Sequence, residues 1–189
     1  LVMKPVIGGL ALQGDFLEHA HLLRSQGAQA LEVRSISDLQ KCSALVIPGG
    51  ESTAISKLLS ESGLGAQIKS RAKKGMPIYG VCAGAIVVAK KVKGEKRFLP
   101  LGLIDIEVER NAYGRQAESF ESEVDFVGGK MRGVFIRAPA IKKTGKGVEV
   151  LATLNGKPVL VRQGKIIAGT FHPELAGEKA VHEMLLGIL

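Results

Sequence analysis

Short apolar runs alternate with amphipathic segments through the first half of the chain. Four apolar runs predict buried strands, over residues 6–12, 30–33, 44–47 and 77–80. The segments between them carry helix start and stop signals and predict helices over about 15–26, 52–62, 66–74 and 82–91. Asp15 is the expected N-cap of the first of these helices, and Gly27 is its expected stop. Strands that alternate with helices of this length form parallel βαβ units, with helices on both faces of the sheet.

The second half of the chain has a different pattern. Six short strands are predicted, followed by a helix over about 178–189; the strands cover residues 103–109, 119–127, 134–137, 148–154, 158–162 and 166–171. Asn155-Gly156 and Gln163-Gly164 are hairpin signals. We therefore expect a three-layer α/β fold with a mostly parallel central sheet, helices on both faces and additional antiparallel strands in the second half. No linker or repeat interrupts the pattern, so residues 1–189 are predicted to form a single domain.

Composition excludes several classes of protein. The 189 residues include no Trp, 2 Tyr and 6 Phe, which is too few for the aromatic platform of a single-strand nucleic-acid binder. No apolar run approaches the ~20 residues that cross a bilayer, and no signal segment is recognisable. With two cysteines, Cys42 and Cys82, and no export signal, we expect a cytoplasmic protein in a reducing compartment.

The formal charge of +8 leaves three interpretations open: a nucleic-acid surface, an acidic partner, or solubility alone. Nine of the 26 basic residues lie between Lys69 and Arg97. We call these residues the basic cluster. A solvated helix face and loop is the favoured interpretation of the basic cluster.

The stretch Gly80-Val81-Cys82-Ala83-Gly84 carries the clearest chemical signal. A cysteine between two glycines, where a strand meets a helix, has the layout of a nucleophile elbow. The glycines permit a strained turn that exposes the sulfur, and the helix N-terminus favours the thiolate. The alternative is a small buried cysteine in a glycine-rich turn, and this pattern alone does not decide between the two.

A base for such a cysteine is available in Phe171-His172-Pro173-Glu174. On an extended segment, residues i and i+2 point to the same side, so Glu174 is expected behind the imidazole of His172 as its orienting carboxylate. The remaining histidines, His19, His21 and His182, are expected in solvated or capping roles, and Cys42 is expected to be structural.

A glycine turn forms the third part of the predicted site. In Pro48-Gly49-Gly50-Glu51-Ser52-Thr53, two glycines after a buried strand can present backbone N–H groups to a developing oxyanion. The lysine of a phosphate-binding loop is missing from this stretch. Next to a Cys/His/Glu set, the turn is predicted to form one wall of an oxyanion hole.

The elbow together with His172-Pro173-Glu174 resembles the class I (triad) glutamine amidotransferases, whose fold is flavodoxin-like. Further stretches resemble the PdxT/SNO family, the glutaminase subunits of pyridoxal 5′-phosphate synthases, at residues 10–15, 48–53, 108–111, 114–116 and 134–139. The resemblance runs in family order from about Val6 to Leu189. Gly9 departs from it, because an aliphatic residue is usual at that place in the first strand.

The resemblance implies hydrolysis of L-glutamine to L-glutamate and ammonia by a triad of Cys82, His172 and Glu174, through a glutamyl thioester. It implies an oxyanion hole formed by the backbone N–H groups of Gly50 and Ala83. The residues expected to contact glutamine by the same resemblance are Gly49, Gly50, Glu51, Arg110, Ile136 and Arg137. From spacing alone, structural ion pairs would have been the preferred role for the two arginines.

The resemblance also implies a partner. The ammonia is expected to pass to a barrel-shaped synthase subunit of the PdxS/SNZ type, whose dodecameric core carries up to twelve amidotransferase subunits. The chain itself is expected to need no metal or organic cofactor, and to bind neither nucleic acid nor membrane. Part of the basic cluster is expected to follow the elbow helix and to meet acidic residues of the synthase.

Three other functions remain open on the sequence alone. The chain could be the amidotransferase subunit of another pathway, such as histidine or purine synthesis. It could be a non-catalytic regulatory subunit of a synthase, although the complete set of Cys82, His172 and Glu174 argues against this. It could also be a stand-alone cysteine hydrolase, which would turn over glutamine at full rate without a partner.

Overall fold

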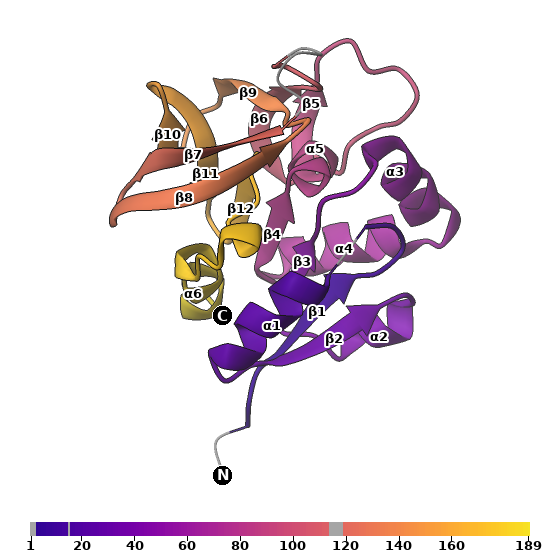
Figure 1. The fold of residues 1–189 in the computed structure, drawn as a ribbon. Coiled ribbons are helices and arrows are strands. Elements are labelled where there is room, and N and C mark those ends of the chain that lie inside the picture. Colours follow the sequence, from indigo (N-terminus) through magenta and orange to yellow (C-terminus); the bar gives the residue numbers. More distant parts are fainter. Residues whose placement is uncertain (1–2, 15, 114–118) are drawn as a thin grey trace.

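The computed structural model describes residues 3–14, 16–113 and 119–189, and its centre is a nine-stranded sheet (Figure 1). Five neighbouring strands are parallel, in the order β2 (Gln29–Val33), β1 (Val6–Leu10), β3 (Ala44–Ile47), β4 (Ile78–Val81) and β12 (Ile166–Gly169). Four antiparallel strands continue the sheet, in the order β11 (Lys157–Gln163), β10 (Glu149–Leu154), β7 (Ser119–Phe126) and β8 (Gly129–Ile136). This arrangement confirms the predicted parallel half and antiparallel half.

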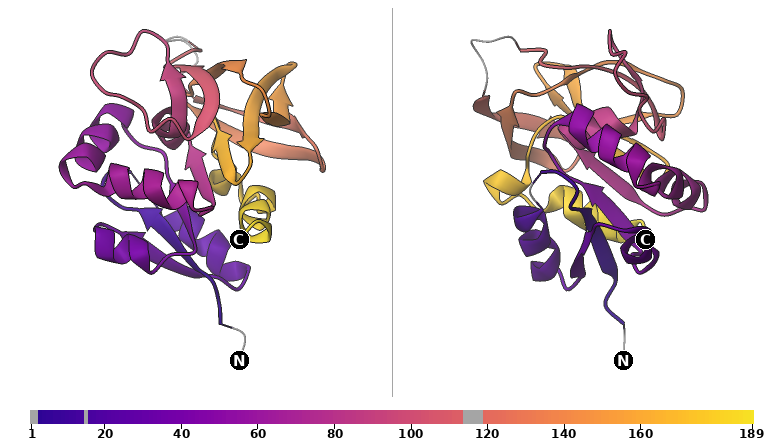
Figure 2. Two further views of the ribbon diagram at one scale, coloured as in Figure 1. Left: turned by 180° about the vertical axis from the view of Figure 1, so that it is seen from behind. Right: turned by 90° about the vertical axis from the view of Figure 1, so that its right-hand side faces the viewer.

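Helices cover both faces of the parallel strands (Figure 2). One face carries α1 (Leu17–Ser25) and α6 (Ala180–Gly187), and the other carries α2 (Ile36–Gln40), α3 (Ser52–Glu61), α4 (Leu64–Lys73) and α5 (Ala83–Val88). The three-layer α/β fold expected from the sequence is therefore confirmed. Within the described residues, no helix has the length and apolar character needed to span a bilayer.

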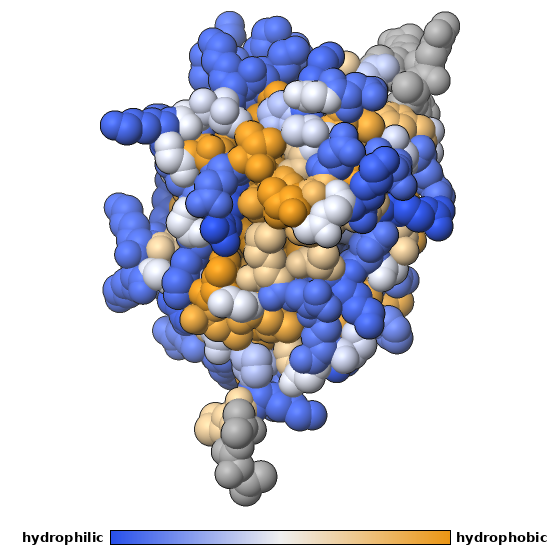
Figure 3. Space-filling model, turned by 90° about the vertical axis from the view of Figure 1, so that its left-hand side faces the viewer, coloured by the Kyte–Doolittle hydropathy of each residue, from blue (hydrophilic) through white to orange (hydrophobic). Residues whose placement is uncertain are grey.

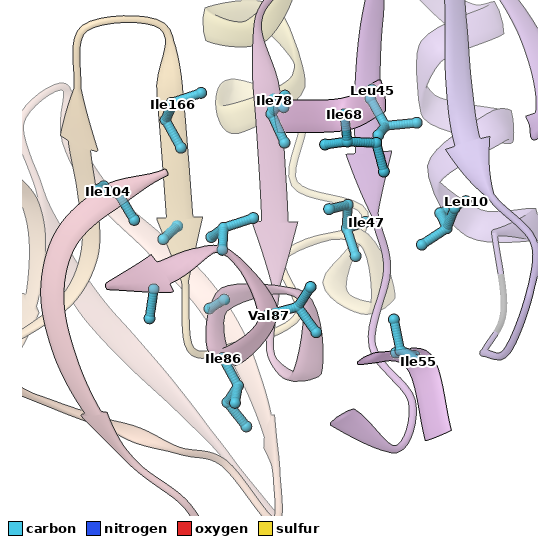
Figure 4. Close-up of a cluster of buried hydrophobic side chains, with 14 of the residues drawn as sticks. Leu10, Leu45, Ile47, Ile55, Ile68, Ile78, Ile86, Val87, Ile104 and Ile166 are labelled. Carbon is cyan, nitrogen blue, oxygen red and sulfur yellow. The ribbon is translucent and has the colours of Figure 1, made fainter. Parts of the chain in front are cut away.

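Strand β3 shows why the apolar runs are continuous. Leu45 and Ile47 join the hydrophobic cluster under α3, α4 and α5, part of which Figure 4 shows. Ala44 and Val46 point to the opposite face and join the cluster under α1 and α6. All four side chains are fully buried, because a parallel strand covered on both faces has no solvent side.

The helix predicted over 82–91 ends early. It stops at Val88, and the chain continues as β5 (Ala89–Val92), which pairs with β6 (Ile104–Glu109) in a separate three-stranded sheet completed by β9 (Ala140–Thr144). The backbone becomes extended at Ala89, with a φ of −59° and a ψ of 155°. Pairing with β6, which lies far along the sequence, then replaces the last turns of helix.

Carboxylates of this small sheet pair with three of the nine residues of the basic cluster. Lys90 lies 3.0 Å from Asp105, and Lys91 lies 2.9 Å from Glu107. Lys93 lies 2.9 Å from Glu109 in the same way. The basic cluster is therefore not one continuous patch of unpaired charge.

Several local features differ from the expectations. The short helix α2 begins with a capping box between Ser35 and Asp38, and neither α2 nor β9 was predicted. The N-cap of α1 is Phe16, and Asp15 lies outside the described residues, as do residues 114–118. The hairpin at Asn155-Gly156 is confirmed, with φ values of 50° and 75° that suit its tight turn.

Gly9 is explained by its neighbour Phe16. A Cβ atom at Gly9 would overlap the ring of Phe16, which is 6% exposed and packs on β1. The ring occupies the space that an aliphatic side chain in the first strand would fill, so the packing of β1 is preserved.

Several large apolar side chains are exposed. Figure 3 shows one side of the molecule, on which apolar residues gather near the centre and hydrophilic residues surround them. The exposed large apolar residues are Met3, Leu17, Leu99, Val127, Ile136, Val150, Leu175 and Leu189.

Candidate active site

Cys82 occupies a strained turn between β4 and α5. Its φ of 53° and ψ of −105° are unusual for a residue with a side chain. Its N–H group donates to the carbonyl oxygen of Gly169 at 2.8 Å, which ties the turn to β12. A Cβ at Gly84 would overlap the carbonyl oxygen of Ile47, and one at Gly80 would lie 2.5 Å from the oxygen of Gly84. The turn therefore requires both glycines, as a nucleophile elbow does.

We predict that Gly84→Ala destabilises the protein by about 1–3 kcal/mol, because the new methyl group forces α5 away from β3. A lower midpoint of thermal unfolding would show this effect. Gly187→Ala is the matched control, because a Cβ at this position in α6 meets nothing within 4 Å and alanine favours a helix. Equal unfolding midpoints for the two variants would contradict the packing argument.

His172 and Glu174 lie directly after β12. The N–H group of His172 donates to the carbonyl oxygen of Val134 in β8 at 2.8 Å, which fixes the backbone of the base. Glu174 begins the 3-10 helix η2 (Glu174–Ala176), and its Oε1 lies 2.6 Å from His172 Nδ1. The structure thus brings the two side chains together in the predicted order, with the carboxylate behind the imidazole.

Burial and charge act on these two groups in opposite directions. Burial alone would lower the pKa of His172, but its contacts with Cys82 and Glu174 raise that pKa to about 10. Burial alone would raise the pKa of Glu174, but hydrogen bonding to His172 and His19 holds it well below its usual range. Glu174 is therefore ionised at neutral pH, and the protonated form of His172 is favoured.

The predicted solvated or capping roles of His19 and His182 are wrong. These two side chains are 1% and 0% exposed, and His19 Nδ1 lies 2.9 Å from His182 Nε2. Nε2 of His19 lies 3.2 Å from Glu174 Oε1. A signal was present, because His19 shares the apolar face of α1 with Phe16 and Leu23. His21, on the other side of α1, is exposed as expected.

A cavity of about 420 Å³ opens beside the sulfur of Cys82. The walls contain every residue predicted from the sequence to act in catalysis, oxyanion binding or glutamine binding. These residues are Gly49, Gly50, Glu51, Cys82, Ala83, Arg110, Ile136, Arg137, His172 and Glu174. Other walls come from residues not predicted to contribute, namely Gly14, Glu18, Ser52, Ile86, Asn111, Pro139 and Leu175.

The glycine turn after β3 faces His172. A Cβ at Gly49 would lie 2.5 Å from Cε1 of that imidazole, so only glycine permits this approach. The Glu51 N–H group donates to Gln13 Oε1 at 2.6 Å, which anchors the turn to the segment after β1. The carboxylate of Glu51 caps α3 by accepting from Thr53 N at 2.9 Å and Ala54 N at 2.7 Å. Sequence reasoning placed Glu51 in the site but missed this cap and the role of Gln13.

The two arginines of the cavity differ in their partners. Arg110 lies 2.8 Å from Glu95 and 3.1 Å from Glu51, so it belongs to an ion-pair network as well as to the cavity wall. The ion pair of Arg110 with Glu95 was not predicted from the sequence. Arg97 and Arg110 hold the pKa of Glu95 well below its usual range. Arg137 is exposed and has a φ of 41°, and none of the described carboxylates lies within 4.0 Å of its guanidinium group.

Cys42 does not line this cavity and has a different environment from Cys82. It is 3% exposed, packs in the core under α2, and donates to the carbonyl oxygen of Asp38 at 3.3 Å. Burial raises the pKa of the Cys42 thiol to about 11, which makes it a poor nucleophile at neutral pH.

Comparison with known proteins agrees with this geometry. Residues 9–187 match the SNO glutamine amidotransferase family. The curated protein named pyridoxal 5′-phosphate synthase subunit PdxT is 50% identical in Thermus thermophilus, over 97% of each chain, and 50% identical in Mycolicibacterium vanbaalenii, over 98% of each.

Solved structures give the same result. A crystal structure described as that of a glutamine amidotransferase superposes with a TM-score of 0.92 at 48% identity, covering 96% of this chain and 97% of that one. PurLQS from Thermotoga maritima shares the fold alone, with a TM-score of 0.71 at 16% identity, covering 98% of this chain and 99% of that one. The match over nearly the whole chain shows that the protein belongs to the SNO glutamine amidotransferase family.

Proposed function

We propose that this protein hydrolyses L-glutamine to L-glutamate and ammonia, and that it does so as the glutaminase subunit of a pyridoxal 5′-phosphate synthase. The observation that carries the proposal is the cavity in which Cys82, His172 and Glu174 meet. The name PdxT, carried by relatives of 50% identity, supports the choice of synthase.

The first half of the reaction forms a thioester. The Cys82 proton resides on Nε2 of His172, because Nδ1 faces Glu174 and the protonated imidazole is favoured. The resulting thiolate of Cys82 attacks the side-chain carboxamide carbon of glutamine. His172 then gives this proton to the leaving nitrogen as the C–N bond breaks. Ammonia leaves, and a γ-glutamyl thioester remains on Cys82. Glu174 stabilises the imidazolium before it gives up this proton.

The second half of the reaction reverses these roles. His172 takes a proton from water, the hydroxide adds to the thioester carbon, and the C–S bond breaks to release glutamate and restore the Cys82 thiolate. In both halves a tetrahedral oxyanion forms. The backbone N–H groups of Gly50 and Ala83, two residues that line the cavity, are the proposed donors to it.

Glutamine is proposed to bind along the remaining wall. Arg137 offers a guanidinium group without a described carboxylate partner, so it suits the α-carboxylate of the substrate. Arg110 is already paired with Glu95 and Glu51, and it contributes a wall with less net charge. Gly49, Glu51 and Ile136 complete the proposed contacts with the substrate.

The ammonia is proposed to pass directly to a synthase subunit. Ammonia released into water at neutral pH is protonated to ammonium and loses its nucleophilicity. The partner is proposed to be a barrel-shaped subunit of the PdxS/SNZ type with a dodecameric core and up to twelve amidotransferase subunits, in the cytoplasm. The proposed chemistry requires no metal or organic cofactor, nucleic acid or membrane.

A glutaminase assay with and without this synthase subunit tests the proposal. We expect glutamate release to increase when the synthase is added, and we expect nitrogen from amide-labelled glutamine to appear in pyridoxal 5′-phosphate. Stimulation by a histidine or purine synthase instead would remove the specific assignment. Full turnover without any partner would favour a stand-alone hydrolase, and absence of glutamate under all conditions would favour a regulatory subunit.

A further inference from the structure

A series of four polar side chains in contact with one another extends from the cavity to α6. It begins at His172 Nδ1, which lies 2.6 Å from Glu174 Oε1. The same oxygen lies 3.2 Å from His19 Nε2, and His19 Nδ1 lies 2.9 Å from His182 Nε2. The mechanism above uses the first two residues and leaves the two inner histidines without a role.

The charges along this series determine where its protons lie. Glu174 is ionised and only accepts hydrogen bonds, so the nitrogen of His19 that faces it must carry a hydrogen. Burial, together with the neighbouring His19, lowers the pKa of His182 to about 3, so His182 is neutral. A neutral His182 that donates from Nε2 to His19 Nδ1 places the hydrogen of His19 on Nε2, the nitrogen that lies 3.2 Å from Glu174 Oε1. The reverse arrangement would charge His19 and leave the Nδ1–H group of His182 buried without a partner.

The aromatic neighbours hold the His19 ring in this orientation. The ring of Phe16 stacks on His19 with centroids 6.2 Å apart, and Tyr79 meets it edge to face at 6.3 Å. Tyr79 also meets His182 at 5.8 Å. A ring packed in this way has little freedom to rotate, so its N–H group stays directed at Glu174.

Glu174 needs such a partner because its other supports are few. It lies on a 3-10 helix of three residues, and its Oε2 is buried without a hydrogen-bond partner among the described residues. His172 alone would leave the carboxylate free to rotate about its last side-chain bond. A second donor on the same oxygen restricts that rotation.

We propose that His19, with its tautomer set by His182, is a positioning residue that holds the Glu174 carboxylate in line with His172. The proposal rests on the proposed function, because it assigns His19 to the same triad. Several elements contribute the charged or titratable side chains around Glu174 and His172. These side chains are Cys82 of the elbow, Tyr79 of β4, Glu18 and His19 of α1, and His182 of α6.

Two amide substitutions separate the two contacts of His19. The amide nitrogen of glutamine occupies roughly the place of imidazole Nε2, so His19→Gln keeps a donor toward Glu174. The amide nitrogen of asparagine occupies roughly the place of Nδ1, so His19→Asn keeps only the contact with His182. Both variants introduce a neutral amide, so similar effects on the free energy of unfolding are expected for the two.

We expect His19→Gln to keep kcat for glutamine within about twofold of the unsubstituted protein in the complex with the synthase. We expect His19→Asn to lower kcat about tenfold with little change in KM, because the contact of the His19 Nε2–H group with the Glu174 carboxylate is lost. His21→Asn, at an exposed position of the same helix, is the matched control and should leave kcat unchanged.

A spectroscopic measurement makes the test independent of activity. With only 4 histidines in the chain, the imidazole N–H signals of His172 can be assigned by nitrogen-15 NMR. The Nδ1–H signal of His172 should persist in His19→Gln and should shift or broaden in His19→Asn. Equal signals and equal kcat for the two amide variants would overturn the proposal, even if both lower the stability. An inactive unsubstituted protein whose His172 signal still responds in this way would contradict only the proposed function.

A double-mutant cycle tests the part assigned to His182. If His182 acts only through His19, His182→Gln should change kcat in the unsubstituted protein and cause no further change in the His19→Asn background. Independent effects of the two substitutions would exclude the tautomer-setting role and leave His182 as a packing residue.

Discussion

Replacement of Cys82 by alanine is expected to lower the rate of glutamine hydrolysis by about a million-fold, to the background of the assay. Loss of a catalytic nucleophile has an effect of about this size, because no other group can form the covalent intermediate. Cys82 is 8% exposed and borders the cavity, so removal of one sulfur atom should leave the fold and synthase binding intact. Glutamate formation and co-elution with the synthase are the two measurements.

Cys42→Ala is the matched control for this substitution. Cys42 is the second free cysteine, buried under α2, and its high pKa makes it unreactive. This variant should keep its activity and lose at most a modest part of its stability, as expected for a small buried side chain. If Cys82→Ala still released glutamate, or if Cys42→Ala abolished release, the assignment of the nucleophile would be wrong.

Replacement of Glu174 by glutamine is expected to lower kcat by about 10³–10⁴-fold, the range found when a triad carboxylate becomes an amide. The carboxylate supplies the negative charge that, together with Cys82, raises the pKa of His172 to about 10 against the effect of burial. Without this charge, burial dominates and the imidazolium needed to protonate the leaving nitrogen is disfavoured. Glu178→Gln is the matched control, because the amide oxygen can still accept from the N–H group of Arg132.

The same substitution should change how stability depends on pH. The pKa of His172 is higher in the folded protein, about 10, than in the unfolded chain, about 6.5. The stability that its proton contributes is therefore complete below about pH 6.5 and is lost as the pH rises toward 10. This loss should be smaller in Glu174→Gln, which denaturation at several pH values can measure. An identical pH dependence in both proteins would show that Glu174 does not act on His172.

The parts of the fold that sequence patterns predicted were those with strong local signals. Strand β3 is covered on both faces, so its apolar run is unbroken. Asn155-Gly156 marks the turn between β10 and β11, because both residues favour the positive φ values that the turn requires. Strand β5 was missed because its identity depends on β6, a partner that local periodicity does not reveal. Helix α2 was missed because five residues are too few for a helical period to stand out.

The site shows the same division. Cys82 and His172-Pro173-Glu174 are recognisable because each is a short motif with its own backbone requirement. His19, His182 and Glu95 have partners far away in the sequence. The apolar face of α1 indicates that His19 is buried, but it does not reveal these partners. Their partners emerge only when α1, α6 and the segment after β5 are placed around the sheet (Figure 1).

The bridge between β8 and His172 joins two parts of the site that lie far apart in the sequence, the cavity wall at Ile136 and the catalytic base. Val134 holds the backbone of His172, while Ile136, two residues further along the same strand, lines the cavity and places its carbonyl oxygen 3.8 Å from the Cys82 sulfur. The β7–β8 hairpin is therefore a single mechanical unit that carries both a substrate wall and the anchor of the base. A substitution that shifts this hairpin is expected to move the cavity wall and the backbone of His172 together, and so to change turnover without altering a reacting group.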